Sequence, residues 1–313
     1  MASKNSRKVI VTCAVTGGGH TPTMSPYLPV TPDQIVDEAV AAANAGASVI
    51  HLHARKAENG QPTGDPAVWL DILSRIKQQT NAVLNTTTGG STYMAIEERL
   101  ASPLKAQPEL ASLNLGSMNF GTFVMAPKYS EWKHDWEYGH LENSRDAIFK
   151  NTFKDIETIL ERLGEGCGTR FEFECYDVGH LYTLAHFLDR KLARPPLFIQ
   201  MVLGPLGGIG PDVENLVHMK RIADKLFGQD FQWSVLAAGR YQIPLATVGA
   251  VMGSNVRVGL EDNLYIAPGK LAESNADQVT LIRTVLGNLS MEIATPDETR
   301  QMLALKGADQ VAF

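Results

Sequence analysis

The sequence is poor in cysteine and lacks any long apolar run, and each shortage excludes a class of protein. Its 313 residues include only three cysteines, Cys13, Cys167 and Cys175, which are odd in number and show no paired spacing. A disulfide framework is therefore not expected, and a reducing, cytoplasmic environment fits better. No run of about 18 apolar residues could span a bilayer. The polar N-terminus also lacks the apolar core of a secretory signal.

Positive charge is also in deficit. The chain carries 28 Lys and Arg against 34 Asp and Glu, which gives a net charge of −6 at pH 7. That balance argues against a general attraction to nucleic acid or to an acidic membrane. With 44% hydrophobic and 20% charged residues the composition is ordinary for a globular protein, and the length suits one large α/β domain or two small ones. We expect small-molecule partners.

Short β-rich runs alternate with longer helical ones along the chain, which indicates a parallel α/β fold. We expect helices between the strands, including one capped by Thr31, one near 143–163 after an irregular stretch at 116–142, and one near 270–286. Eight strand–helix units predict a closed (β/α)8 TIM barrel, with a doubly wound open sheet as the alternative. We interpret residues 1–313 as a single (β/α)8-barrel domain with residues 1–7 as a loose N-terminal tail. The expected strands are 9–14, 47–53, 82–87, 110–115, 170–175, 197–203, 232–236 and 255–259.

The strongest local signal is a pair of histidines, His51 and His53, at the end of the second expected strand. Residues two apart in a strand point to the same face and lie about 6.5 Å apart along the chain, so the two imidazoles project together. Two imidazoles at a strand end can chelate one divalent ion with a third ligand from elsewhere. The alternative for the pair alone is a set of hydrogen-bonded barrel histidines without a metal.

The eighth expected strand offers the third ligand. Arg257, Gly259 and Glu261 share one face of this strand, while apolar residues take the other. If the Arg257 face points into the barrel, Glu261 reaches the C-terminal mouth, where such folds carry catalysis. His51, His53 and Glu261 would then leave positions on a metal open for substrate or water. A surface acidic turn is the alternative for Glu261 alone.

Polar side chains recur at the ends of other strands. Pairs of residues two apart share a face where a core would be apolar: Asn85 and Thr87, Ser112 and Asn114, and Glu172 and Glu174. They predict a polar upper lumen that binds a polar substrate, unless these groups only satisfy one another. The glycine-rich loops at 16–20 and 204–210 could bring backbone amides to an anion. His20 is a candidate substrate contact, and we assign the remaining histidines to surface or packing roles: His134, His140, His180, His186 and His218.

Several runs resemble the β-keto acid cleavage enzyme family, whose best-known member is 3-keto-5-aminohexanoate cleavage enzyme. The likeness runs in order from about residue 9 to 305 and covers nearly the whole chain. The paired His-x-His and the Glu-Asp-Asn ending are its most specific parts. The matching runs are HLHAR from His51, TTGG from Thr87, SLN from Ser112, NFG from Asn119, QMVLG from Gln200, AGR from Ala238, RVGLEDN from Arg257 and AESNA from Ala272.

The resemblance implies a zinc-dependent (β/α)8 barrel, usually a homo-oligomer with a tetramer favoured. The implied reaction condenses a β-keto acid with acetyl-CoA, giving acetoacetate and a new acyl-CoA. By similarity, one Zn²⁺ per subunit is bound by three ligands: His51, His53 and Glu261. The implied substrate contacts are Thr87, Gly90 and Ser112, to which the sequence pattern adds Asn114 and His20.

Three further residues are implicated in the chemistry by the same resemblance. Arg257 and Asp262 match a pair that takes part in acid–base steps, and Glu174 matches an acidic pocket position. The Arg257 guanidinium is expected to lower the pKa of Asp262 and keep this candidate base ionised at neutral pH. One departure concerns Gly19, which stands where the aminohexanoate enzyme has a Glu that binds the substrate amine. A keto acid with a different far end is therefore favoured.

Other functions on the same barrel stay open from the sequence alone. A metal-dependent retro-aldolase or lyase that does not use CoA is the main enzymatic alternative, and dependence on acetyl-CoA separates the two. Amidohydrolases also use His-x-His, but usually on the first strand with a carbamylated lysine, whereas His51 and His53 belong to the second. A metal-stabilised binding protein would need the polar lumen to be inert toward β-keto acids.

Overall fold

The computed structural model describes residues 8–313, and its centre is a closed barrel of eight parallel strands. Neighbours around the barrel follow the order β10-β11-β2-β3-β4-β5-β8-β9, so β11 closes the ring by pairing with β2. The predicted (β/α)8 TIM barrel is confirmed, and the open sheet is excluded. The barrel strands are β2 (Val11–Ala14), β3 (Val49–Leu52), β4 (Val83–Thr87), β5 (Leu110–Asn114), β8 (Arg170–Cys175), β9 (Leu197–Leu203), β10 (Phe231–Ala237) and β11 (Asn255–Val258).

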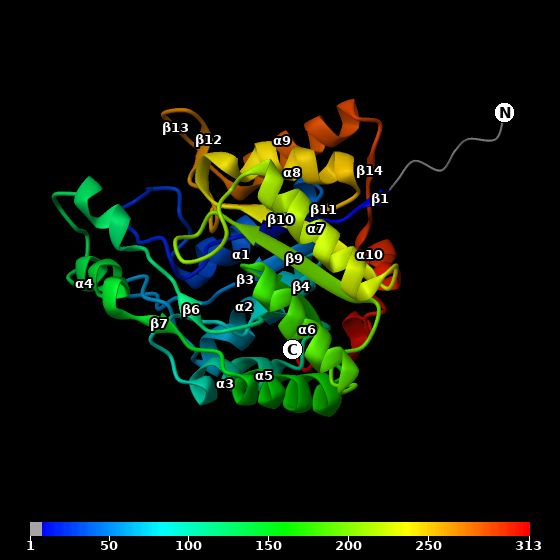
Figure 1. Cartoon of the computed structure of the whole chain (residues 1–313). Coiled ribbons are helices and arrows are strands. Elements are labelled where there is room, and N and C mark those ends of the chain that lie inside the picture. The colour runs from blue at the N-terminus through cyan, green and yellow to red at the C-terminus, as the bar shows by residue number, and fades with distance from the viewer. Residues whose placement is uncertain (1–7) are drawn as a thin grey trace.

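Helices between the strands cover the outside of the barrel (Figure 1). Capping boxes fix the starts of several of them; at α1, the Thr31 side chain accepts from the Gln34 N–H and Pro32 takes the first turn, as predicted. The α-helices are α1 (Pro32–Ala45), α2 (Pro66–Gln79), α3 (Ile96–Ala106), α4 (Trp136–Glu142), α5 (Phe153–Ile159), α6 (Val178–Asp189), α7 (Val213–Phe227), α8 (Gln242–Met252), α9 (Asn275–Asn288) and α10 (Pro296–Leu303).

Short strands and short helices lie at the two ends of the barrel. Figure 1 shows α4, β6 and β7 at the end toward which β9 points, and α10 at the opposite end. The short strands are β1 (Lys8–Val9), β6 (Met118–Asn119), β7 (Ile148–Phe149), β12 (Tyr265–Ala267), β13 (Lys270–Leu271) and β14 (Glu292–Ile293). The short helical turns are η1 (Phe123–Lys128), η2 (Asn143–Asp146), η3 (Leu160–Glu165), η4 (Gly239–Tyr241) and η5 (Ala308–Gln310).

The alternation of side chains along each strand decides where the core lies. Outward residues such as Ile50, Leu52 and Val258 are fully buried against the helices. Inward residues near the N-terminal end of the barrel form a smaller apolar cluster that includes Val49, Leu110 and Phe198. Toward the C-terminal end the inward residues become polar, so the barrel has an apolar floor and a polar mouth.

Two helix predictions were wrong at their starts. The helix expected near 143–163 begins only at Phe153, because Thr152 and Asp155 form a capping box there and the preceding residues form η2 and β7. The helix expected from residue 270 begins at Asn275, because 270–271 pairs as β13 and Ser274 caps α9. The irregular stretch at 116–142 contains β6, η1 and α4. The tail predicted at 1–7 lies outside the described residues.

Within the described part of the chain, none of the helices combines the length and apolar character needed to cross a membrane.

Candidate metal centre and active site

A cavity of about 460 Å³ opens at the C-terminal mouth of the barrel. Because strand ends and the loops after them build this mouth, it collects residues from strands far apart in sequence. Ten of the eleven predicted site residues line it: His20, His51, His53, Thr87, Gly90, Asn114, Glu174, Arg257, Glu261 and Asp262. The eleventh, Ser112, is 1% exposed and lies deeper in the barrel, where its carbonyl accepts a hydrogen bond from Thr88.

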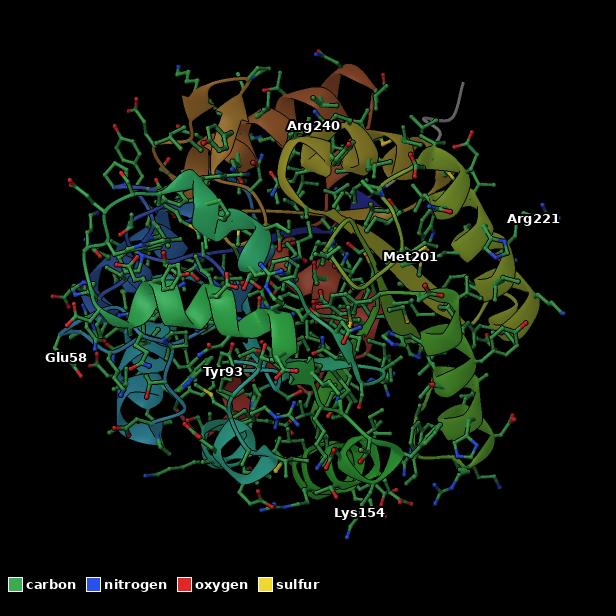
Figure 2. The ribbon with its side chains drawn as sticks, turned by 60° about the vertical axis from the view of Figure 1, so that its left-hand side comes forward. Glu58, Tyr93, Lys154, Met201, Arg221 and Arg240 are labelled. Atoms are coloured by element: carbon green, nitrogen blue, oxygen red, sulfur yellow. The ribbon has the colours of Figure 1, made fainter. Side chains whose placement is uncertain are left out.

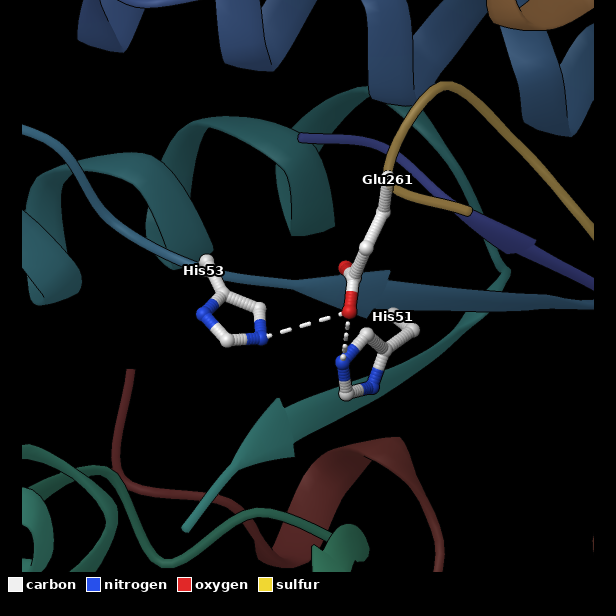
Figure 3. Close-up of side chains that lie close together, drawn as sticks. All are labelled: His51, His53 and Glu261. Atoms are coloured by element: carbon white, nitrogen blue, oxygen red, sulfur yellow. Dashed lines mark ion pairs between the residues drawn. The ribbon is translucent and has the colours of Figure 1, made fainter. Parts of the chain in front are cut away.

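The three predicted metal ligands converge on one point (Figure 3). The Oε1 atom of Glu261 lies 3.6 Å from Nε2 of His51 and 3.5 Å from Nε2 of His53. One donor atom from each residue lies within 4.8 Å of the other two. The two histidines at the end of β3 and Glu261, which lies far along the chain, therefore present two imidazole nitrogens and one carboxylate to the same small space.

The chemical state of these residues suits a divalent metal. Burial lowers the pKa of His51 against the opposing effect of Glu261, and this shift favours the neutral imidazole that can offer a lone pair. Burial raises the pKa of Glu261, but the neighbouring His53, His51 and Arg257 outweigh burial and hold this pKa well below its usual range. The second oxygen of Glu261, Oε2, is buried without a hydrogen-bond partner among residues 8–313. Two imidazole nitrogens and an ionised carboxylate are donors that zinc prefers.

Two glycines make room for this convergence. Gly17 has φ of +61°, and a Cβ atom there would lie 2.4 Å from Cγ of Glu261, so a side chain at this position would displace the carboxylate. Gly259 has φ of +134°, and its Cβ would lie 2.1 Å from the carbonyl oxygen of Ala14. The turn that aims Glu261 into the mouth therefore depends on both glycines.

Arg257 is the electrostatic centre of the mouth. Its Nε and Nη2 atoms bind Asp262 at 2.9 and 3.1 Å, and Nη2 also binds Glu261 at 2.9 Å. The remaining Nη1 faces Glu174 at 3.3 Å and Glu172 at 3.5 Å. Arg257 is 2% exposed, and the surrounding carboxylates outweigh burial and raise its pKa well above the usual value. This guanidinium thus fixes the positions of Glu261, a candidate metal ligand, and of three other acids.

The protonation expected for Asp262 needs a correction. Arg257 does lower the pKa of Asp262, as predicted, but burial raises it more strongly and Glu261 and Glu174 add to the rise. The net effect is a pKa of about 7. Sequence reasoning could identify the neighbouring guanidinium but not the degree of burial.

The wall formed by β4 and β5 presents donors that suit a carboxylate. Thr87 Oγ1 accepts hydrogen bonds from the N–H groups of Gly89 and Gly90 at 2.9 and 3.3 Å. With its acceptor side occupied, the Thr87 hydroxyl proton is free to point into the cavity. Asn114 lines the same wall, 7% exposed.

The loop after β2 is held by a buried arginine. Arg55 is fully buried and donates to Thr16 Oγ1, to the carbonyls of Thr16 and His20, and to that of Gly60, at 2.7–3.1 Å. His20 in this loop contacts the Leu260 carbonyl through Nδ1 at 3.0 Å, and burial lowers its pKa to about 4. His20 therefore lines the mouth as a neutral imidazole.

Comparison with known proteins places this chain in a family. The sequence matches the family described as beta-keto acid cleavage enzyme over residues 8–305. The chain belongs to the β-keto acid cleavage enzyme family. The prediction of this family, and of an enzyme rather than a binding protein, is thereby confirmed.

Two relatives of this β-keto acid cleavage enzyme and one solved structure show how far the likeness extends. The 3,5-dioxohexanoate:acetyl-CoA acetone transferase of Paraburkholderia graminis is 62% identical over the full length of both chains. The 3-keto-5-aminohexanoate cleavage enzyme of Fusobacterium nucleatum is 33% identical, covering 96% of this chain and 98% of its own. The apo structure of ObcA has a TM-score of 0.69 at 21% identity, covering 90% of this chain and 66% of that one, and shows the fold alone.

Sequence reasoning about this β-keto acid cleavage enzyme missed two cavity residues. His140 on α4 lines the mouth and contacts the Gly18 carbonyl through Nε2 at 3.0 Å, although it was assigned to a surface or packing role. Tyr176 also lines the cavity and donates to Oε2 of Glu174 at 3.1 Å. Tyr176 continues the inward face of β8 and could have been found by extending that alternation by one step. His140 had no such signal, because α4 reaches the mouth through a long excursion.

Proposed function

We propose that the protein is a zinc-dependent β-keto acid cleavage enzyme that acts with acetyl-CoA on a β-keto acid with an uncharged far end. The favoured substrate is 3,5-dioxohexanoate, named for the relative that is 62% identical. Transfer would give acetoacetate and acetoacetyl-CoA: the C2–C3 bond of the keto acid breaks, C2 bonds to the acetyl carbon, and CoA takes the remaining acyl group. Acetyl-CoA as co-substrate is supported by the name of this relative.

The choice of substrate rests on one observation, which is that the carboxylates lining the cavity already bind Arg257. Among the described residues the acids that line the cavity are Glu174, Glu261 and Asp262, and each lies within 3.3 Å of Arg257. None is left to bind a substrate amine. Gly19, where the aminohexanoate enzyme has a Glu, adds no charge. A cavity without a spare carboxylate favours a keto or alkyl group at the far end.

Each reacting group of the β-keto acid has a partner in the chain. The Thr87 hydroxyl, the Asn114 amide and the backbone near Gly90 would hold the substrate carboxylate. Asp262 would accept the proton from C2, which is acidic because it lies next to the keto group, and would return it to C2 once the C2–C3 bond has broken. Arg257 would hold Asp262 through two hydrogen bonds and keep it aimed at that carbon.

His51, His53 and Glu261 would hold the metal ion, which when bound supplies Lewis-acid polarisation of the keto group. Zinc is proposed over other divalent metals because the donor set has two imidazoles and one carboxylate. Neutral His51 and ionised Glu261 need no proton loss before ligation.

Location and assembly are further parts of the proposal. We propose a cytoplasmic protein, supported by three free cysteines of which Cys13 and Cys175 are buried. We propose a homotetramer, supported by exposed apolar side chains on three neighbouring outer helices, α6, α7 and α8. These are Tyr182, Val213, Val217 and Val251, which are 36–65% exposed.

A substrate panel tests the proposed function. Purified enzyme of known metal content is given 3,5-dioxohexanoate, 3-keto-5-aminohexanoate or 3-oxoadipate, each with and without acetyl-CoA, and both acetoacetate and acyl-CoA are measured. We expect turnover only with acetyl-CoA, and a kcat/KM that is highest for the uncharged far end. Cleavage without acetyl-CoA would indicate a retro-aldolase instead, and a preference for the amine would contradict the argument from the lining carboxylates.

A further inference from the structure

A level of polar side chains crosses the barrel lumen beneath the metal centre. Barrel strands are staggered by about one residue per strand, so every second strand contributes a residue to the same level. A path that stays at one level crosses two strand pairings and then moves two residues along the chain. This step leads from Asn85 to Glu172, and from Glu172 to Ser234. The same step leads from Ser234 to Thr12 and back to Asn85. Register thus places these four residues in one closed ring, which we call the polar level.

The polar level is sealed and its groups are poorly partnered: the Asn85 side chain lies close enough to Glu172 to lower the pKa of that carboxyl, and Glu172 faces Arg257 at 3.5 Å. All four residues are 0% exposed. The side-chain oxygens and the amide nitrogen of this level make no hydrogen bond of standard geometry within residues 8–313. Toward the N-terminal end the lumen is closed by the apolar cluster of Val49, Leu110 and Phe198. Buried polar groups without a good hydrogen bond are strongly unfavourable, and a small polar molecule between them would supply the missing partners.

Glu172 connects this level to the catalytic centre. Its Oε1 lies 3.5 Å from Nη1 of Arg257, which is an ion-pair distance but longer than a good hydrogen bond. Burial raises the pKa of Glu172 to about 8, against the lowering by Arg257, and Glu174 adds to the rise. The carboxyl is then largely neutral at pH 7 and can both donate and accept hydrogen bonds. A neutral Glu172 also avoids a fourth negative charge around a single guanidinium.

We propose that the polar level is a buried water site, and that through it Glu172 acts as the positioning residue for Arg257. Waters between Thr12, Asn85, Ser234 and Glu172 would supply the good hydrogen bonds that the chain does not give these groups. Held in this way from below, the guanidinium keeps its place against Glu261 and Asp262. The role of Arg257 in turnover rests on the proposed function, whereas the water site itself does not.

A crystal structure at high resolution tests the water site directly. We expect ordered waters within hydrogen-bonding distance of Thr12, Asn85 and Ser234, at least one of which also contacts Glu172. Continuous side-chain packing with no density between these groups would overturn the water site. This result does not depend on which β-keto acid the enzyme uses, so it stands even if wild-type enzyme forms no acetoacetate.

Two substitutions of Glu172 test the positioning role. Glu172→Gln keeps a neutral hydrogen-bonding group, so we expect most of the wild-type kcat and an unmoved Arg257. Glu172→Leu keeps similar volume without polar atoms, so we expect Arg257 to shift in the crystal structure and kcat to fall about 10²-fold with little change in metal content or in either KM. An unmoved Arg257 in Glu172→Leu, or a Gln variant as impaired as the Leu variant, would overturn the role.

The matched control lies in the apolar floor. Phe198→Leu removes buried volume beside Glu172, its register partner on β8, without replacing any residue of the polar level, so we expect a lower Tm and an unchanged kcat. A loss of kcat in Phe198→Leu equal to that in Glu172→Leu would show that any damage to the lumen slows turnover, and would count against a specific role for Glu172.

Discussion

Replacing Asp262 by Asn separates metal binding from proton transfer. The substitution keeps the shape of the side chain but leaves only one oxygen to accept from Arg257, where Asp262 now accepts at 2.9 and 3.1 Å. A hydrogen bond to a charged group contributes about 1.5–3 kcal/mol, and we expect the free energy of unfolding to fall by that amount. Arg257 keeps its contacts with Glu261 and Glu174, so its charge stays compensated.

The expected effect on turnover of Asp262→Asn is larger. An amide cannot accept a proton, and loss of a general base costs about 10²–10⁴ in rate, which is about 3–5 kcal/mol of activation free energy. Metal content should be unchanged because Asp262 is outside the set of His51, His53 and Glu261. The measurements are acetoacetate formation, metal analysis by mass spectrometry and urea unfolding on the same preparation.

Glu109→Gln provides a matched control for this prediction. Glu109 accepts three hydrogen bonds of 2.8–3.2 Å from Arg300 and is 3% exposed, but it lies just before β5, at the end of the barrel away from the mouth. We expect a similar loss of stability and no loss of kcat. A wild-type kcat in Asp262→Asn with full metal content would refute Asp262 as the base. An equal loss of kcat in both variants would refute the reasoning that the effect is local.

Three further predictions concern the metal, the far end of the substrate and the entry of CoA. His51→Ala should remove bound metal and turnover while leaving the fold, and full turnover by a verified metal-free preparation would contradict this. Gly19 has no atom nearer to an added Cβ than Thr122 at 3.9 Å, so Gly19→Glu should fit, raise KM for an uncharged substrate at least about tenfold and admit an amine; an unchanged preference would exclude this loop from substrate recognition. Arg240 lies beside the cavity-lining Gly239 and should contact a CoA phosphate, so Arg240→Ala should raise KM for acetyl-CoA alone about three- to tenfold. The control is Lys154→Ala, because Lys154 is exposed and lies at the bottom of Figure 2, whereas Arg240 lies near the top. Equal effects of Arg240→Ala and Lys154→Ala would exclude a specific contact.

The barrel was predictable from the eight strand–helix units, and the convergence of the three candidate metal ligands was predictable from alternation along single strands. His51 and His53 lie two apart, so one strand fixes their shared direction whatever the rest of the chain does. Glu261 follows the inward face of β11, and the rule that catalytic groups gather at the C-terminal mouth supplied the rest. Ten of the eleven predicted residues therefore line the cavity.

Depth along the barrel axis was not predictable in the same way. Alternation gives the face of a residue but not its level, which depends on the stagger between strands. Ser112 and Glu172 share inward faces with Asn114 and Glu174, yet they lie below the cavity. The pKa of Asp262 depended on burial, which is also a property of depth. His140 lies on α4, and its position at the mouth could not be predicted without knowing the path of the whole chain between β5 and β8.

The order of the strands places the three candidate metal ligands where the barrel closes. β11 pairs with β2, and β2 pairs with β3, so Glu261 and the two histidines sit on either side of the strand at which the ring closes. An ion bound there would link the last barrel strand to the first two across the junction at which the ring closes, which we call the seam. Because an ion that binds only the closed ring stabilises it by mass action, chelators should make the seam exchange its amide hydrogens faster than the opposite side of the barrel.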